Sequence, residues 1–281
     1  MAHLAEQQSY SMGPFKVTLL PDGGGIVVPT VTYPASTPEA WQGRFASLLD
    51  DEGALPVTIA GFLIEVGDQK IIMDTGLGPL RLDFPGFGPF FGGKFLDSLA
   101  ATGVRREDVT EVVFSHMHLD HVGWSTIEEN GQRVLTFPNA RYLVTELEWN
   151  FWYGTDHPAG PNPERVQQPL AGVIQFIAPG DTLAPGITVL HTPGHTPGHI
   201  SFELKAGDER LMLIVDLLHN IVQFAEPDWG VPFDFDMAQA AATLKAMLAE
   251  DKDMSHALEA SFNRNLIGKL SRANSGAPAE A

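Results

Sequence analysis

The sequence predicts a single α/β domain, on three observations. Its 281 residues are enough to bury one large core, and 44% of them are hydrophobic and 19% charged, which is ordinary for a globular chain. Short β-branched apolar runs, such as LPVTIAGFLIEV at 55–66, recur along the chain and indicate strands. Helical segments lie among them, of which 236–250 is the clearest because it is rich in Ala, Leu and Met after an Asp.

The first third of the chain is predicted to be mainly strands. Residues 15–29 read as two short strands joined by a Gly-rich turn, and a Pro-rich stretch with a short helix at 41–49 follows. The runs 55–66 and 70–76 form a hairpin across GDQ. Residues 77–95 hold five Phe among Gly and Pro, and this composition predicts a loop that is either a surface feature or an apolar wall over a pocket.

The remainder is predicted to alternate between helices and strands. We expect helices at 95–104, 146–154, 163–176 and 236–250, and strands at 110–115, within 133–145, at 187–191, in HISFEL and at 209–216. Residues 1–14 form an N-terminal extension, 15–270 a single domain, and 271–281 a small, polar, disordered tail.

Composition excludes several kinds of site. The chain has no cysteine, which rules out disulfides, thiolate metal ligands and a cysteine nucleophile. Its formal net charge of −18 disfavours nucleic acid and anionic membranes as partners. No run approaches the ~18 apolar residues of a membrane span, and the N-terminus lacks a secretory pattern, so we expect a cytoplasmic protein.

The stretch SHMHLDH at 115–121 carries the chemical signal. It directly follows the apolar run VVF, and His116 and His118, two residues apart, project to the same side of an extended backbone. Asp120 and His121 follow where a turn can aim them at a second position. Surface histidines would be the ordinary explanation, but neutral imidazoles beside a carboxylate suit a metal ion.

Two further segments place polar residues at the ends of apolar strands. These are HTPGHTPGH at 191–199 and Asp216, which ends the run LMLIVD. Strand ends that converge at one edge of a sheet are a common way to build an active site on a rigid scaffold. Together with 115–121, they predict a metal centre.

These residues resemble the HxHxDH signature and the following motifs of metallo-β-lactamase-fold hydrolases, in the same order, over about residues 15 to 256. The resemblance implies an αββα sandwich, in which two mixed sheets lie back to back with helices outside and a dinuclear metal centre at one edge. It implies that His116, His118 and His195 bind one ion, that Asp120 and His121 bind the other, and that Asp216 bridges both. Asp74 and His199 would support the ligands from behind, a role that acids often take by hydrogen-bonding ligand imidazoles.

The superfamily has one more histidine ligand, some forty residues after the bridging acid. His256 stands at that distance and follows the 236–250 helix, but its surroundings, DKDMSHALEASF, are polar and show no clear strand. His219, three residues after Asp216, is the alternative, although it fits a place beside the pocket better. We favour His256.

The expected reaction is hydrolysis by a metal-bridging hydroxide, with Asp120 as the catalytic acid–base. The DLLH context and the length resemble the branch that contains N-acyl-homoserine lactonases and methyl parathion hydrolase. We therefore expect an apolar lactone or ester as substrate. The alternatives are an organophosphate triester, then a glyoxalase-II-type thioester, or a catalytically weak metal-binding or ligand-sensing member of the fold.

Two divalent ions per chain are implied, Zn before Fe, Mn or Co. The exposed aromatic loop is also consistent with a homodimer contact. Aromatic residues are available for an apolar pocket, with His219 beside it: Phe84, Phe87, Phe90, Phe91, Trp149 and Trp152.

Overall fold

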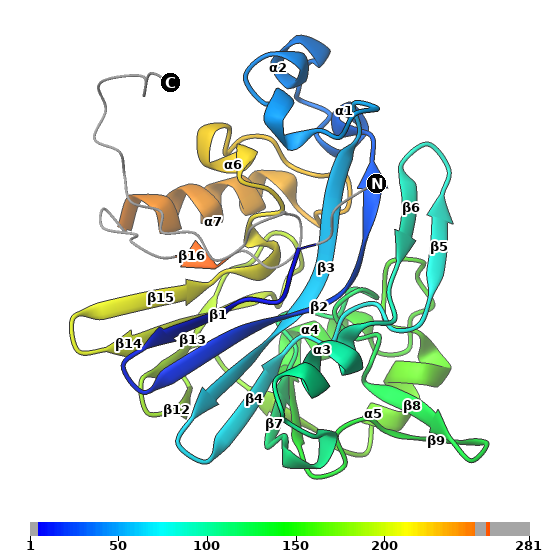
Figure 1. Ribbon diagram of the computed structural model, residues 1–281, viewed down its shortest axis with the longest axis vertical. Helices are drawn as coiled ribbons and strands as arrows, with labels where there is room; N and C mark the ends of the chain where they lie inside the picture. The colour runs from blue at the N-terminus through cyan, green and yellow to red at the C-terminus, as the bar shows by residue number, and fades with distance from the viewer. Residues whose placement is uncertain (1–4, 251–256, 259–281) are drawn as a thin grey trace.

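Two β-sheets packed face to face form the centre of the computed structural model, which describes residues 5–250 and 257–258 (Figure 1). Within the described residues the larger sheet has the order β11-β10-β7-β4-β3-β2-β6-β5, with β1 beside β2, and the smaller has the order β12-β13-β14-β15-β16. A separate hairpin, β8-β9, lies outside both.

The strands of the larger sheet are β1 (Ser9–Met12), β2 (Phe15–Val27), β3 (Leu55–Val66), β4 (Gln69–Met73), β5 (Arg81–Phe84), β6 (Gly88–Phe91), β7 (Glu111–Val113), β10 (Arg141–Thr145) and β11 (Ile174–Ile177). Those of the smaller sheet are β12 (Thr182–Ala184), β13 (Ile187–His191), β14 (Ile200–Ala206), β15 (Glu209–Leu213) and β16 (Ala257–Leu258). The separate hairpin consists of β8 (Thr126–Glu129) and β9 (Gln132–Leu135).

The described helices are α1 (Pro29–Thr32), α2 (Pro38–Gln42), α3 (Phe95–Ala101), α4 (Glu146–Trp152), α5 (Gln168–Leu170), α6 (Val222–Ala225) and α7 (Met237–Glu250). Short 3-10 turns occupy Ala46–Leu48, Arg106–Asp108 and Val215–Leu217, and one π-helical turn spans Pro163–Gln167. Asp236 begins α7 as predicted, because its carboxylate accepts a hydrogen bond from Gln239 N at 2.9 Å. No helix among the described residues is long and apolar enough to cross a membrane.

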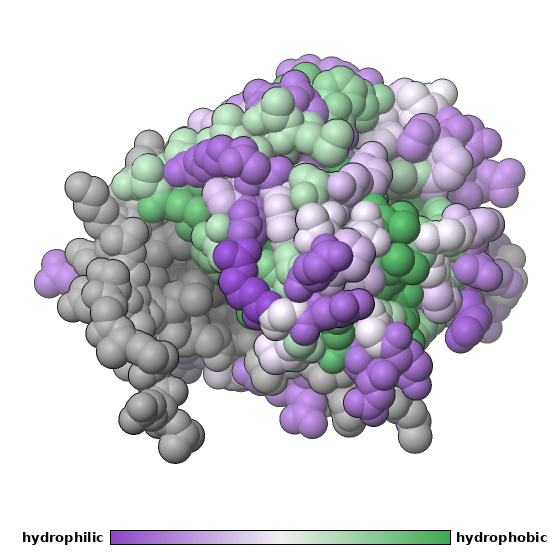
Figure 2. Space-filling model, turned by 90° about the horizontal axis from the view of Figure 1, so that it is seen from above, coloured by the Kyte–Doolittle hydropathy of each residue, from purple (hydrophilic) through white to green (hydrophobic). Residues whose placement is uncertain are grey.

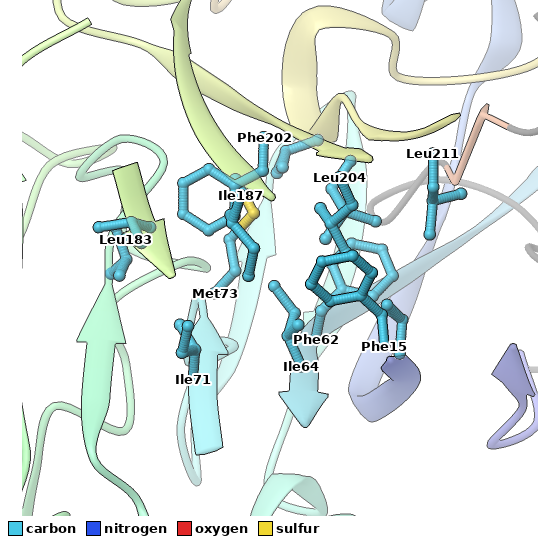
Figure 3. Close-up of a cluster of buried hydrophobic side chains, with 14 of the residues drawn as sticks. Phe15, Phe62, Ile64, Ile71, Met73, Leu183, Ile187, Phe202, Leu204 and Leu211 are labelled. Carbon is cyan, nitrogen blue, oxygen red and sulfur yellow. The ribbon is translucent and has the colours of Figure 1, made fainter. Parts of the chain in front are cut away.

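The main core fills the space between the two sheets. Alternate residues of β3 and β4 on one side face alternate residues of β13, β14 and β15 on the other, and all are buried (Figure 3). The large side chains in this layer include Phe15, Phe62, Met73, Phe202 and Leu204. Separate apolar clusters lie under α3 and α4 on the outer face of the larger sheet and under α7 on that of the smaller sheet. The molecule is therefore the αββα sandwich that the resemblance implied.

The sheet topology brings the predicted site residues to one edge. β4, β7 and β10 are parallel neighbours, with Met73 paired to Val113 and Val113 to Leu143. Parallel strands end at the same edge, so the segments that follow each of them lie side by side. Those segments begin with Asp74, with Phe114 just before Ser115, and with α4.

The predicted Phe-rich loop is instead a hairpin, β5-β6, added to the sheet beside β2. Gly24 and Gly25 of β2 pair with Phe91 and Phe90 of β6. A Cβ on Gly23 would lie 1.9 Å from the Phe91 carbonyl oxygen, so only glycine permits this approach. The Gly-rich stretch is therefore not a turn between two strands. It belongs to one long strand, β2, with a bulge between Pro21 and Gly23.

Two smaller expectations also differ from the structure, and a third is not tested by it. The helix predicted at 163–176 ends near residue 170, and β11 occupies 174–177. β1 pairs with β2 over Ser9–Met12, so the predicted N-terminal extension contributes a strand to the larger sheet. The predicted tail at 271–281 lies outside the described residues.

Candidate metal centre

Three imidazoles converge at this edge of the sheets. His116 and His118 follow β7, and His195 lies in the loop between β13 and β14. His118 Nδ1 lies 2.8 Å from His195 Nε2 and 3.1 Å from His116 Nε2, and the Nε2 atoms of His116 and His195 are 3.2 Å apart. All three side chains are buried. Nitrogens this close around one point can share a single metal ion.

A second group of side chains surrounds the carboxylate of Asp216. Its Oδ2 lies 3.3 Å from His121 Nε2 and 3.4 Å from His195 Nε2. His116 Nε2 is 3.9 Å from the same oxygen, and Asp120 Oδ2 is 3.8 Å from His121 Nε2. The Asp216 carboxylate therefore lies between the two predicted ligand sets, which is the place that a bridging ligand needs.

Asp74 supports the histidine loop from behind. Its Oδ2 lies 2.9 Å from His121 Nδ1 and accepts a hydrogen bond from Ser115 Oγ at 2.6 Å, while Oδ1 accepts one from Ser115 N at 2.8 Å. Ser115 Oγ is in turn 2.9 Å from His116 Nδ1. Asp74 thus orients one imidazole directly and another through Ser115, so that their Nε2 atoms point into the centre.

The protonation states favour metal binding. Burial lowers the pKa of His116 and of His118 well below the usual value, which keeps both imidazoles neutral. Burial opposes ionisation of Asp216, yet the neighbouring His121 holds its pKa well below the usual value. Neutral imidazoles and an ionised carboxylate are the forms that bind metals.

His121 shows where positive charge is favoured. Burial disfavours its protonation, but the surrounding carboxylates, Asp216 first and then Asp120 and Asp74, raise its pKa well above the usual value. Its buried Nε2 faces Asp216 Oδ2 at 3.3 Å but makes no hydrogen bond of good geometry among the described residues. A buried nitrogen without a hydrogen bond, set among carboxylates, fits a divalent cation.

The side of His195 that faces away from His116 has two partners, of which sequence reasoning named His219 and missed Asp234. His195 Nδ1 lies 2.8 Å from Asp234 Oδ1, in the segment before α7. His219 Nε2 lies 3.2 Å from the same nitrogen and 3.7 Å from Asp216 Oδ2. His195, Asp216 and His219 form a further group with ligand atoms close enough to hold a metal ion. The alternative of His219 as last ligand thus has a geometric basis, while His256 lies outside the described residues.

His199 supports the centre in a different way from Asp74. Its Nδ1 lies 2.8 Å from Thr192 Oγ1, and its ring packs on that of His116 with centroids 5.2 Å apart. Both histidines are buried. His199 thus contacts the ring of His116, and among the described residues it makes no hydrogen bond to a predicted ligand.

An apolar cavity of about 310 Å³ opens onto the centre. Phe84, Phe87 and Phe90 of the β5-β6 hairpin line it. Its inner end is formed by His118, Asp120 and Asp216, and the remaining lining residues are Ile59, Leu77, Leu82, Leu119, Ala159, Pro232 and Phe233. Figure 2 shows the molecule from above, at the end that carries α1 and α2. On this face, hydrophobic residues are exposed among hydrophilic ones.

The other predicted pocket residues take different places. Trp152 lines a neighbouring cavity of about 390 Å³ that also touches His118 and His195. Trp149 is buried in the outer core and stacks on Tyr153, and Phe91 pairs with β2, so neither lines these cavities. His219 does not line either cavity, but its ring packs against that of Phe233, which lines both.

Asp22 was also missed and determines where the aromatic hairpin lies. Its buried carboxylate accepts hydrogen bonds at one end of the hairpin from Leu77 N (2.7 Å) and Gly78 N (3.0 Å). At the other end it accepts them from Gly93 N and Phe95 N, both at 2.9 Å. A fifth comes from Trp124 Nε1 at 2.8 Å. The only local signal was the sequence PDGGG, which resembles a turn.

Comparisons with known proteins agree with this fold and site. The family model of the metallo-beta-lactamase superfamily matches residues 56–254. An N-acyl homoserine lactonase of a Bacillus species is 28% identical over 204 residues, which are 66% of this chain and 73% of that protein. The N-acyl homoserine lactonase AttM of Agrobacterium fabrum is 31% identical over 139 residues, 47% of this chain and 49% of that protein.

Solved structures give the same picture. AidC, a dizinc quorum-quenching lactonase, aligns with a TM-score of 0.82 over 96% of both chains at 24% identity, which shows the fold alone. The hydrolase AbOPH, of the beta-lactamase superfamily, aligns with a TM-score of 0.77 at 26% identity over 96% of this chain and 95% of its own. The family match and the names of the relatives confirm the expected fold and the expectation of an enzyme of the hydrolase class.

Proposed function

The chain belongs to the metallo-β-lactamase superfamily, and from this premise we propose that it hydrolyses lactones or esters with an apolar acyl group at a dinuclear metal centre. The observation that carries the proposal is the cavity of about 310 Å³ that leads to Asp120 and Asp216. Its walls are mainly aromatic and aliphatic, and they offer an acyl chain burial next to the polar centre. The named lactonases among the relatives support the same substrate class.

Two divalent ions, bound there, would supply an activated water and a Lewis acid for the carbonyl oxygen. We propose His116, His118 and His195 as ligands of one and Asp120 and His121 of the other, with Asp216 between them. Either His219, from its position beside Asp216, or His256 would complete the set.

Asp120 is the proposed proton carrier. Its Oδ2 lies 3.8 Å from His121 Nε2 and its side chain lines the cavity, so the carboxylate reaches both the ligand cluster and the cavity. Its side chain is 23% exposed, so it can contact a substrate in the cavity, and burial raises its pKa. A carboxylate there can take a proton from the attacking water and pass it to the leaving oxygen.

The test is a hydrolysis panel on protein loaded with zinc or cobalt. It compares butanoyl- and decanoyl-homoserine lactone, simple aryl esters and a paraoxon-type triester, with Asp120→Asn as the matched inactive variant. We expect the long-chain lactone or the aryl ester to have the highest kcat/KM and the variant to lose at least ~10²-fold. Turnover of the triester above all carbonyl substrates would instead identify an organophosphate hydrolase.

Metal content separates the enzyme from a catalytically weak member of the fold. We expect about two ions per chain after loading and dialysis, measured by plasma mass spectrometry. One ion or none, with no substrate turned over above Asp120→Asn, would contradict the hydrolase proposal.

A further inference from the structure

We infer that Glu148 is a positioning residue that holds the two histidine-bearing loops in a fixed relation, so that His118 and His195 present their nitrogens to the same ion. The inference rests on the proposed function, because it takes these histidines as metal ligands. Among the described residues, Glu148 makes no hydrogen bond to either imidazole, and it reaches the two loops through the backbone N–H groups of Met117 and Gly198.

The carboxylate of Glu148 joins three segments. Oε1 accepts hydrogen bonds from Met117 N at 3.0 Å and from Trp152 Nε1 at 2.7 Å. Oε2 accepts one from Gly198 N at 3.0 Å. The Glu148 side chain is fully buried, so these bonds replace all of its contact with water.

The two backbone donors belong to the two loops of the metal centre. Met117 is the residue between His116 and His118, and Gly198 lies three residues after His195. One carboxylate therefore links the two loops through one hydrogen bond on each side. A shift of either loop would lengthen one of these bonds and separate His118 Nδ1 from His195 Nε2, which now lie 2.8 Å apart.

The second loop is seated directly on the first turn of α4. Thr145 Oγ1, at the N-terminal end of that helix, donates a hydrogen bond to Gly198 O at 2.9 Å. A Cβ on Gly198 would lie 2.4 Å from Glu148 N, so the close approach needs glycine here. Both the N–H and the carbonyl of Gly198 are thus held by α4 or by its first residues.

The chemistry of the three donors explains why an acid stands at this place. A carboxylate only accepts hydrogen bonds, and the three partners named above are all N–H groups. A glutamine could keep one oxygen on Met117 N and Trp152 Nε1, but its NH₂ group would then face Gly198 N, donor against donor. The link to the His195 loop is therefore the one that Glu148→Gln breaks.

The test compares Glu148→Gln with Glu146→Gln, an exposed acid in the same first turn of α4. The readouts are the Kd for Co²⁺, measured by competition with a chelator, the visible spectrum of the cobalt protein, and Tm. We expect Glu148→Gln to weaken binding of Co²⁺ by about 10- to 100-fold and to change the ligand-field bands, because outer partners of metal ligands have effects of that size. Glu146→Gln should match the wild type in all three.

The outcomes separate this inference from the proposed function. A wild-type protein that binds no cobalt overturns both. Wild-type affinity and an unchanged spectrum in Glu148→Gln, with or without a lower Tm, overturn the positioning role alone. If Glu148→Gln does not fold, Thr145→Val removes the other link to Gly198 and should weaken Co²⁺ binding in the same direction; unchanged binding there contradicts the inference.

Discussion

Asp74 Oδ2 lies 2.9 Å from His121 Nδ1, and both side chains are almost completely buried. The backbone of Asp74 has φ +61°, a conformation that most residues other than glycine avoid and that Asp tolerates better than most. That conformation follows directly on β4 and turns the carboxylate toward the loop after β7. The orientation of His121 is therefore set by a residue 47 positions earlier in the chain.

Replacing Asp74 by Asn removes a charged acceptor from His121 and from Ser115. We expect Asp74→Asn to lower the affinity of the second metal position by about 10- to 100-fold, because this partner fixes the tautomer and the angle of the imidazole. Titration with Co²⁺ followed by metal analysis measures the change. Asp68→Asn, an exposed acid in the turn between β3 and β4, is the control, and equal affinities in the two variants would contradict the prediction.

Replacing Asp22 by Asn leaves buried N–H groups without an acceptor. We expect Asp22→Asn to lower the free energy of unfolding by about 3 kcal/mol, since each unsatisfied buried group costs about 1–3 kcal/mol. Urea unfolding measures the loss, with Asp83→Asn on the exposed side of β5 as control. A second consequence is a higher KM for the apolar substrate, because the hairpin loses its anchor. A loss of stability within the error of the control would show that the anchor is dispensable.

Phe87 tests the role of the cavity wall. We expect Phe87→Ala to raise KM for a decanoyl lactone about tenfold and KM for a butanoyl lactone much less. Only the long acyl chain reaches the Phe87 ring, and losing that apolar contact costs ~1.4 kcal/mol of binding free energy. The control is Phe176→Ala, which removes an exposed ring on β11, at the opposite edge of the same sheet. Equal changes for both chain lengths would place the acyl group elsewhere.

The buried phenol of Tyr142 should make the free energy of unfolding fall at alkaline pH, independently of the metal centre. Its hydroxyl accepts a hydrogen bond from Phe137 N at 3.0 Å and donates one to Ser125 O at 3.3 Å, and burial raises its pKa well above the usual value. The folded state therefore keeps the proton at a pH where the unfolded chain, with a pKa of about 10, releases it. The stability that this neutral phenol contributes is intact below pH 10 and falls as the pH rises above it.

Urea unfolding at pH 9 and pH 11 measures this effect. The wild type should lose about 1.4 kcal/mol more than Tyr142→Phe between the two values, since the variant has no phenol to ionise at this position. Parallel losses in both proteins would mean that other groups cause the alkaline sensitivity.

The strand-end motifs could be predicted from the sequence because their signal is local. His116, His118 and Asp120 stand within five residues, directly after an apolar run, and the fold brings them to the edge where His195 and Asp216 also lie. The β-branched apolar runs likewise identified β3 and β4, and the Ala-, Leu- and Met-rich run after Asp236 identified α7.

The residues that hold this site together could not be predicted in this way. Asp22, Glu148 and Asp234 each act on groups that are far away in the sequence, and an isolated acid has no pattern that distinguishes a buried acceptor from a solvated side chain. The Phe-rich segment was misread for a related reason. Its Gly and Pro residues suggest irregular structure, whereas the space that makes it a hairpin is provided by Gly23 and its neighbours in β2.

The aromatic hairpin has a consequence for how this protein can change. It projects at the sheet edge opposite β11, and its attachment uses the glycines of β2 and the single carboxylate of Asp22. The histidine loops follow β7 and β13, and of these attachment points they share the Asp22 carboxylate, through Trp124 Nε1, but not the glycines of β2. Residues 81–91 therefore form an exchangeable module. Substitutions there can redirect substrate preference during evolution or engineering while the reactive centre keeps its inherited geometry.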